Sequence, residues 1–133
     1  NTRAEGFGEE VKRRILLGSF VLSSGFYDAY YMQAQKVRRV ITNDFAKAYA
    51  ECDVIAAPAL PGDPLKLGEG LSDPMAMYLS DIYTVSLNLA GLPGITVPCT
   101  ELNGHKLGLQ LFGKAFGESE LLQVAASVER TFA

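Results

Sequence analysis

The feature that most constrains the fold is an Asn-Gly dipeptide at positions 103 and 104, set between two short apolar runs. Asn-Gly favours a two-residue turn with positive φ at both positions, and this turn joins adjacent antiparallel strands. The runs on either side, residues 95–98 and 107–113, have the length and composition of strands. The sequence therefore predicts a β-hairpin, with His105 exposed beside its turn.

Helical spacing of apolar residues marks three further stretches, residues 9–23, 28–51 and 119–132. Residues 53–59 form a short apolar run that is typical of a buried strand. Residues 75–92 are mostly apolar, and we expect a helix to begin near Ile82. This order of elements predicts an α/β fold in which helices pack on a mixed sheet.

Finer features of these elements can also be predicted. The last helix is expected to place its apolar residues on one side: Leu121, Leu122, Val124, Ala125 and Val128. Residues 60–72 are rich in proline and glycine, which indicates a loop. Asp73 followed by Pro74 is typical of a helix N-cap and the first helical residue.

The composition indicates one ordinary globular domain. The 133 residues are 48% hydrophobic and 20% charged, with a formal net charge of -3. That charge argues against a general nucleic-acid or anionic-membrane binder, and no apolar run approaches the roughly 20 residues that span a bilayer. Lys36, Arg38 and Arg39 form a basic cluster on the second helix, which is either a solvated face or a nucleic-acid contact.

Motifs for covalent catalysis and metal binding are missing from the sequence. It contains no G-x-S-x-G or S-x-x-K motif and no phosphate-binding loop ending in G-K-[ST]. A single histidine, His105, does not support a triad, and Cys52 and Cys99 are too isolated for a zinc or redox motif. Isolated cysteines and a polar N-terminus unlike a secretory signal lead us to expect a cytoplasmic protein.

Two charged residues stand among apolar ones and are candidates for binding. At roughly 100° per residue, Arg14 falls roughly 160° from the centre of the first helix's polar face. A buried arginine needs an anion, which is either a ligand, for which Gly18 leaves room, or an acidic side chain of the protein. Asp81 is either the N-cap of the helix near Ile82 or a ligand for a cation. Together, Arg14 and Asp81 could hold a zwitterion.

Several segments are similar to a known family: GFGEEVKRRILLGSFVLSSGFYDAYYMQAQKVRRVITNDF, DVIAAPALP, DPMAMYLSDIYTVSLNLAGLPGITVPC and LGLQLFGKAF. Over nearly the whole chain they resemble the C-terminal part of amidase-signature enzymes. NLAGLPGITVP is widely shared by amidases, whereas EVKRRILLGSF and SSGFYDAYYMQAQKVR resemble the glutamine-hydrolysing subunit of tRNA-dependent amidotransferases. The resemblance implies an α/β/α sandwich around a mixed sheet.

The resemblance also implies an activity for the parent enzyme. In this family a serine nucleophile, a bridging cis-serine and a lysine base hydrolyse glutamine, and all three belong to the N-terminal half. The ammonia passes to a partner subunit, which uses ATP and magnesium to amidate mischarged tRNA in a complex of A, B and C subunits. Arg14 and Asp81 align with the family's arginine and aspartate that hold the charged ends of glutamine. No cofactor is expected in this chain itself.

We therefore expect residues 1–133 to be the C-terminal segment of one amidase domain, inactive alone because it lacks the triad. A start at Asn1 rather than methionine fits a segment of a longer polypeptide. The alternatives are another amidase-signature hydrolase that acts on a non-amino-acid amide, and an interaction module without chemistry. Apolar faces that such a segment exposes should favour self-association.

Overall fold

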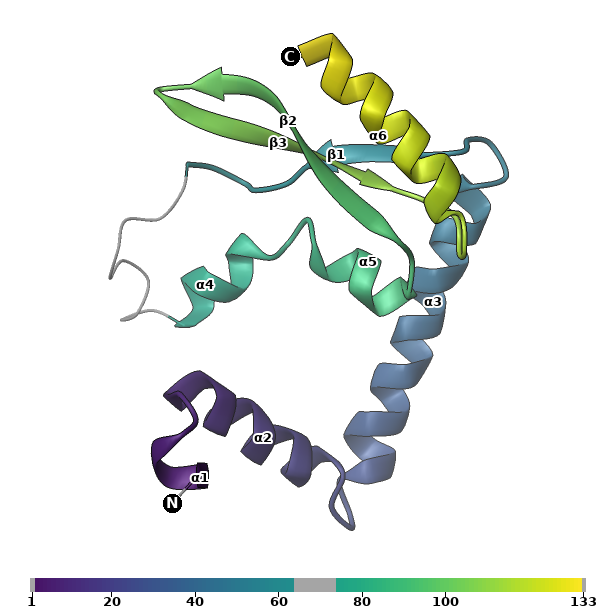
Figure 1. Cartoon of the computed structure of the whole chain (residues 1–133). Helices are drawn as coiled ribbons and strands as arrows, with labels where there is room; N and C mark the ends of the chain where they lie inside the picture. Colours follow the sequence, from purple (N-terminus) through teal and green to yellow (C-terminus); the bar gives the residue numbers. More distant parts are fainter. Residues whose placement is uncertain (1, 64–73, 133) are drawn as a thin grey trace. The chain divides into compact units, whose positions relative to one another are not determined.

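The structure is a computed structural model, and it describes residues 2–63 and 74–132 (Figure 1). The chain divides into two compact units, Asn1–Val40 and Ile41–Ala133, and the boundary falls within a helix. The elements follow in the order α1 (Thr2–Glu5), α2 (Glu9–Val21), the π-helix η1 (Tyr27–Tyr31), α3 (Met32–Ala48), β1 (Ile55–Pro58), α4 (Pro74–Ser80), α5 (Val85–Ala90), β2 (Gly94–Leu102), β3 (His105–Phe112) and α6 (Glu118–Phe132).

The first unit contains α2, where the sequence predicted a helix. Glu9 and Glu10 lie in its first turn, where acidic side chains interact favourably with the helix dipole. The helix ends at Val21, and Gly25 follows with a φ of 89°, a left-handed conformation that glycine adopts without strain. The predicted helix is confirmed, and Gly25 lies in the turn that follows it.

The second predicted helix begins as a π-helix rather than an α-helix. The backbone N–H of Met32 donates to the carbonyl oxygen of Tyr27, five residues back. Aromatic rings pack over this turn, with ring centroids 4.9 Å apart for Tyr27 and Tyr31 and 5.8 Å apart for Phe26 and Tyr30. The long helix predicted from the apolar spacing is therefore confirmed, but its first turn is wider than expected.

The second unit contains a three-stranded sheet in the order β1-β3-β2, and its described pairings are antiparallel. β2 and β3 form the predicted hairpin, in which Asn103 and Gly104 have φ values of 53° and 80°. Positive φ at both positions is the conformation that Asn-Gly favours in a two-residue hairpin turn. The hairpin is confirmed, and β3 becomes the central strand, hydrogen-bonded on both sides.

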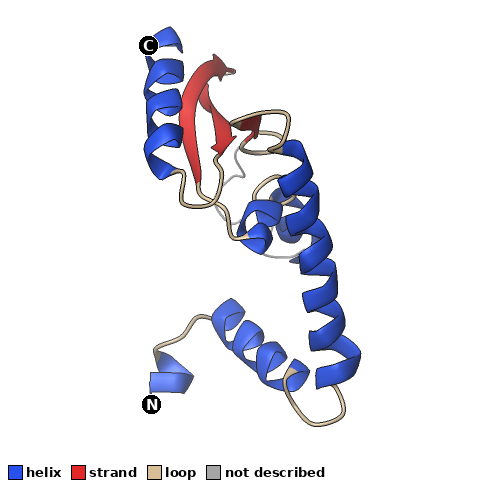
Figure 2. Cartoon of the chain, turned by 90° about the vertical axis from the view of Figure 1, so that its right-hand side faces the viewer, coloured by secondary structure: helices blue, strands red, loops and turns tan. Residues whose placement is uncertain are grey.

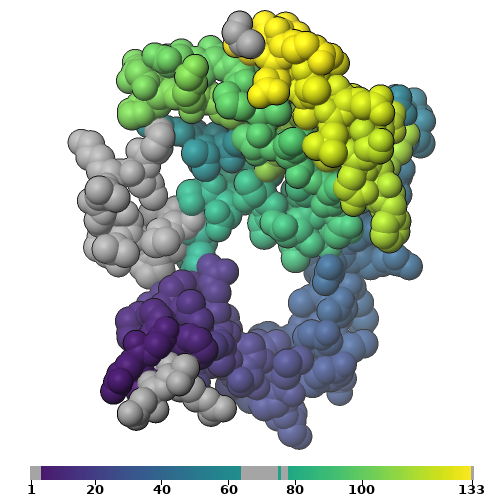
Figure 3. All heavy atoms as spheres, in the orientation of Figure 1, coloured from purple at the N-terminus to yellow at the C-terminus, as the bar shows by residue number. Residues whose placement is uncertain are grey.

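Helix α6 packs on one face of the sheet and forms a core with the hairpin strands (Figure 2). In the space-filling view, α6 in yellow lies over the green strands (Figure 3). The buried core side chains are Val97, Leu111, Leu121 and Ala125. Leu122 was predicted on the same side as Leu121, and this is wrong, because Leu122 is 56% exposed. Adjacent helical residues point about 100° apart, so one buried face does not accommodate both leucines.

The opposite face of the sheet contacts α5 and the C-terminal part of α3 (Figure 2). Leu87 of α5 is buried against Gly94, and a Cβ on Gly94 would collide with the Leu87 side chain. The missing side chain at Gly94 therefore allows α5 to approach the sheet closely. Phe112, paired with Gly94 in the register, makes an edge contact with Phe45 of α3 at a centroid distance of 6.0 Å.

The apolar stretch of residues 75–92 folds into two short helices, α4 and α5, with a turn at residues 81–84 between them. The helix that was predicted to begin near Ile82 starts later, at the first residue of α5. The turn contains Asp, Ile, Tyr and Thr, whose helix propensity is lower than that of the leucines and alanines around them. The predicted N-cap Asp73 and most of the loop predicted over residues 60–72 lie outside the described residues.

Candidate functional site

Arg14 lies on α2, and its guanidinium is paired with Glu10. Arg14 Nε donates to Glu10 Oε1 at 2.8 Å, and Arg13 Nη1 donates to Glu10 Oε2 at 2.7 Å. The Arg14 side chain is 63% exposed, so this pair contributes only about 0.3–0.5 kcal/mol. The alternative of a structural ion pair is therefore present, but at the surface of the unit rather than in a core.

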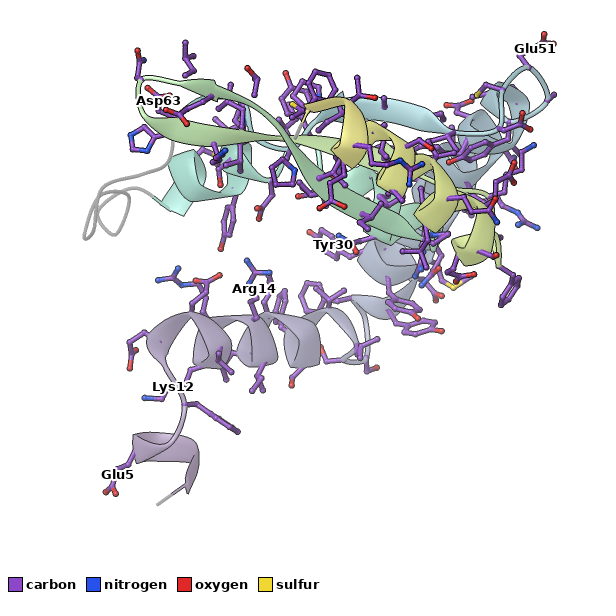
Figure 4. The ribbon with its side chains drawn as sticks, turned by 45° about the horizontal axis from the view of Figure 1, so that its top comes forward. Glu5, Lys12, Arg14, Tyr30, Glu51 and Asp63 are labelled. Carbon is purple, nitrogen blue, oxygen red and sulfur yellow. The ribbon has the colours of Figure 1, made fainter. Side chains whose placement is uncertain are left out.

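The expectation that Arg14 lies on a buried side of its helix is wrong for this chain. None of the described residues of α2 is buried. A helical wheel identifies the apolar side of a helix, but it does not show whether another element covers that side. The angular part of the prediction is confirmed, since Lys12 and Arg14 project from opposite sides of α2 (Figure 4). Apart from the chain neighbours of Gly18 and the helix's own backbone, no described atom lies within 4 Å of where a Cβ would stand at Gly18, so the expected room is present.

Asp81 begins the turn between α4 and α5, and its backbone carbonyl holds that turn together. This carbonyl accepts hydrogen bonds from Thr84 N at 3.0 Å, Val85 N at 2.9 Å and Thr84 Oγ1 at 3.1 Å. The N-cap position of α5 is occupied by Thr84, without a side-chain cap. The N-cap alternative for Asp81 is therefore wrong. The Asp81 side chain is exposed, which leaves its carboxylate accessible to a ligand.

Arg14 belongs to the first unit and Asp81 to the second, and each is described within its own unit. Their meeting at one ligand stays a prediction. Both side chains are exposed, so each is accessible from solvent within its own unit. Arg14 makes a surface ion pair of low energetic weight, and the hydrogen bonds described for Asp81 use its backbone.

Each unit also has a surface hollow. The hollow of the first unit has a volume of about 640 Å³ and is lined by Phe7, Lys12, Ile15, Leu16 and Ser19. A hollow of about 320 Å³ lies against the sheet of the second unit, and its lining includes Cys99, Thr100 and Lys106. Neither of these two hollows is lined by Arg14 or Asp81.

The other residues singled out from the sequence lie where it predicted. His105 is exposed at the start of β3, the basic cluster is exposed on α3, and Cys52 and Cys99 are free and half-buried. Among the residues that the structure describes, no group of His, Cys, Asp and Glu is arranged to hold a metal ion. No helix in residues 2–63 and 74–132 is long and apolar enough to cross a bilayer.

One residue of the second unit was not singled out from the sequence. Gln110 is buried at 5% exposure on the central strand, and its Nε2 donates to the backbone carbonyl of Tyr83 at 3.1 Å. The signal was present, because Gln110 is the polar residue in the otherwise apolar run LGLQLFG. A buried amide needs a hydrogen-bond partner, so such a residue marks a specific contact.

Sequence comparison shows the class of protein. The pattern of the Amidase family matches residues 1–122. The chain belongs to the amidase family, and the predicted resemblance is confirmed. The amidase-signature α/β fold class is confirmed as well, because solved structures of similar shape include an amidase. The mixed sheet that was predicted is not found in the described residues, where the three strands pair antiparallel.

Within this family, the chain is similar to one component of a larger enzyme. The A subunit of glutamyl-tRNA(Gln) amidotransferase from Dechloromonas aromatica is 60% identical over 124 residues, which are 93% of this chain and 26% of that protein. Its counterpart from Thermoanaerobacter pseudethanolicus is 57% identical over 129 residues, which are 97% of this chain and 26% of that protein. The chain therefore spans about a quarter of the length of the curated relatives it matches.

Solved structures extend this similarity. The crystal structure of the A subunit of glutamyl-tRNA(Gln) amidotransferase from Thermotoga maritima is 42% identical with a TM-score of 0.75, over 98% of this chain and 28% of that chain. An allophanate hydrolase of Kluyveromyces lactis is 25% identical with a TM-score of 0.67, over 91% of this chain and 20% of that chain. The same fold is thus found in proteins that have different names.

Proposed function

We propose that this chain is part of the glutamine-hydrolysing subunit of a tRNA-dependent amidotransferase, and that it contributes residues that hold free glutamine. The observation that carries the proposal is the 60% identity, over 93% of the chain, to a glutamyl-tRNA(Gln) amidotransferase component. The allophanate hydrolase is far less similar, at 25% identity. This difference favours the amidotransferase over another amide hydrolase of the same fold.

Arg14 and Asp81 act on the two charged groups of glutamine in this proposal. The planar guanidinium of Arg14 binds the α-carboxylate through two parallel hydrogen bonds, and the Asp81 carboxylate binds the α-ammonium. Neither residue takes part in cleavage of the side-chain amide. They fix the position of that amide relative to the nucleophile, and correct positioning is itself a large part of catalysis.

The ion pair around Glu10 is compatible with this role of Arg14. Glu10 is shared by Arg13 and Arg14, with distances of 2.7 and 2.8 Å. When Arg14 turns to a ligand carboxylate, Arg13 still neutralises Glu10. The exchange therefore costs little, because one exposed ion pair is replaced by another.

The remaining machinery comes from outside this chain. The serine nucleophile, the cis-serine bridge and the lysine base belong to the rest of the parent polypeptide, so the 133-residue chain alone does not release ammonia. The B and C subunits complete the enzyme in the cytoplasm. A partner subunit uses ATP and magnesium to amidate Glu-tRNA(Gln), or Asp-tRNA(Asn), with the ammonia, and it makes most of the contacts with tRNA.

The test uses the full-length parent protein in complex with its partners and numbered as in this chain. Arg14→Lys and Asp81→Asn are the test variants, and Arg13→Lys and Asp44→Asn are matched controls. Arg13 shares the same glutamate as Arg14, and Asp44 is an exposed aspartate paired with a lysine. Asp81→Asn should raise the barrier for glutamine hydrolysis by about 2–5 kcal/mol. Arg14→Lys should also lose activity, because lysine keeps the charge but lacks the planar fork.

The controls should keep the kinetics of the unmodified enzyme. If both test variants hydrolysed glutamine with unchanged kinetics, Arg14 and Asp81 would have structural roles only. Equal activity on glutamine and on amides without charged ends would instead favour the second candidate, an amidase for other substrates.

A further inference from the structure

Gln110 connects the central strand of the sheet to the turn that carries Asp81. Its Nε2 donates to the carbonyl oxygen of Tyr83 at 3.1 Å, across 27 positions of the chain. Tyr83 follows Asp81 by two residues in the turn at residues 81–84. Because Gln110 is 5% exposed, this hydrogen bond is largely shielded from competing water.

The alternation of side chains along β3 explains why Gln110 faces this turn. Leu109 and Leu111 belong to the core that α6 covers. Gln110 and Phe112 point to the opposite face, because successive side chains of a strand alternate. In the register, Gln110 lies opposite Ala57 on the β1 side, and the short alanine side chain leaves room for the amide.

The turn and α5 are attached to this face at two cross-strand pairs, which are successive on this face of the sheet. Leu87 packs on Gly94, in the pair formed by Gly94 and Phe112. Gln110 belongs to the next pair on the same face and holds Tyr83, one helical turn before Leu87. Since β3 is hydrogen-bonded on both sides, these two pairs provide a rigid support.

The other hydrogen bonds described within the turn are local. Thr84 and Val85 donate to the carbonyl of Asp81, which sets the shape of the turn but not its position over the sheet. Gln110 fixes the turn itself over the sheet, while Leu87 fixes the helix that follows. An apolar side chain of similar size would leave the Tyr83 carbonyl without this donor and the turn without this link to the sheet.

We infer that Gln110 is a positioning residue for substrate binding. It holds the turn so that the Asp81 carboxylate lies where the α-ammonium of the amino-acid substrate binds. The inference rests on the proposed function, since it takes Asp81 as the ammonium ligand. Gln110 itself touches neither the substrate nor the reacting atoms.

The experiment uses the full-length parent protein in complex with its partners and two amides, glutamine and glutaramate, which is glutamine without its α-amino group. The test variants are Gln110→Met and Gln110→Asn, and Gln123→Met, an exposed glutamine of α6, is the control. Gln110→Asn keeps an amide but shortens the side chain by one carbon, which withdraws the donor from the Tyr83 carbonyl, so it tests the same bond if Gln110→Met does not fold. The readout is kcat/KM for glutamine divided by kcat/KM for glutaramate. If glutaramate is not hydrolysed, its inhibition constant is compared with the KM for glutamine.

Both Gln110 variants should raise KM for glutamine about tenfold, the scale of one lost buried hydrogen bond, and leave glutaramate unchanged. Amidation of tRNA with ammonia supplied directly should also be unchanged. An equal loss on both amides, or a loss with ammonia, would make Gln110 a purely structural residue and overturn the inference.

Asp81→Asn separates the inference about Gln110 from the proposed function. If Asp81→Asn keeps the preference for glutamine, the proposed function fails. If Asp81→Asn removes that preference and both Gln110 variants keep it, only the inference about Gln110 fails.

Discussion

Replacing Leu121 by alanine should destabilise the second unit strongly, whereas the same change at Leu122 should have little effect. The two leucines are adjacent on α6, but Leu121 is 3% exposed within the core and Leu122 is 56% exposed. Helix propensity and composition change equally in the two variants. The difference between them therefore isolates the contribution of burial.

The magnitude follows from the atoms removed. Leu→Ala deletes three carbon groups, each worth about 0.8 kcal/mol when buried, so the transfer contribution is about 2.4 kcal/mol. The cavity left among Val97, Leu111 and Ala125 brings the total for Leu121→Ala to about 3–5 kcal/mol. Leu122→Ala should stay within about 0.5 kcal/mol of the unmodified chain, as most exposed substitutions do.

Urea unfolding of the 133-residue chain, followed by far-ultraviolet circular dichroism, measures both variants. The midpoint for Leu121→Ala should fall with an unchanged dependence on urea concentration, which indicates a loss of stability rather than a change in the unfolded state. Equal destabilisation by the two substitutions would refute the packing of α6 described above.

Three further predictions concern the second unit and the isolated chain. The Tyr49 hydroxyl donates to the Gly113 carbonyl at 3.0 Å, so Tyr49→Phe should cost about 1 kcal/mol in urea unfolding. Burial, and then the nearby Cys52, raise the pKa of Tyr49, so its contribution should be complete below the ordinary tyrosine pKa and be lost as pH rises through the folded pKa. Gly94→Val should destabilise the sheet by about 1–3 kcal/mol through collision with Leu87, measured in the same assay. The isolated chain should self-associate in light scattering because it exposes many large apolar side chains, and a monodisperse monomer at high concentration would contradict this.

The hairpin and three of the helices could be predicted because they depend on residues that are close together in the sequence. Asn103 and Gly104 specify the hairpin because few other residue pairs adopt positive φ twice at low cost. Apolar spacing located α2, α3 and α6 for a similar reason, since the period of a helix is visible within one segment.

The errors arose where the outcome depends on contacts between segments. The sequence predicted a second helix from near Ile82, but α5 begins only at Val85, after a turn that Gln110, a residue distant in sequence, holds to the sheet. A helical wheel could not predict whether Arg14 is buried, because a wheel contains no information about the elements that cover a helix. The role of Asp81 as a cap was wrong because its backbone, rather than its carboxylate, stabilises the start of α5.

The central claim is that Arg14 and Asp81 hold the charged ends of free glutamine and take no part in the later steps. The most direct measurement compares two sources of nitrogen for tRNA amidation by the assembled enzyme with Asp81→Asn. Glutamine-dependent amidation should fall at least about 30-fold, which corresponds to the lower end of the loss expected when bound glutamine and the rest of the enzyme bury the charge pair. Amidation with ammonia supplied directly should remain at the level of the unmodified enzyme. An equal loss with both sources, or full activity with glutamine, would contradict the account.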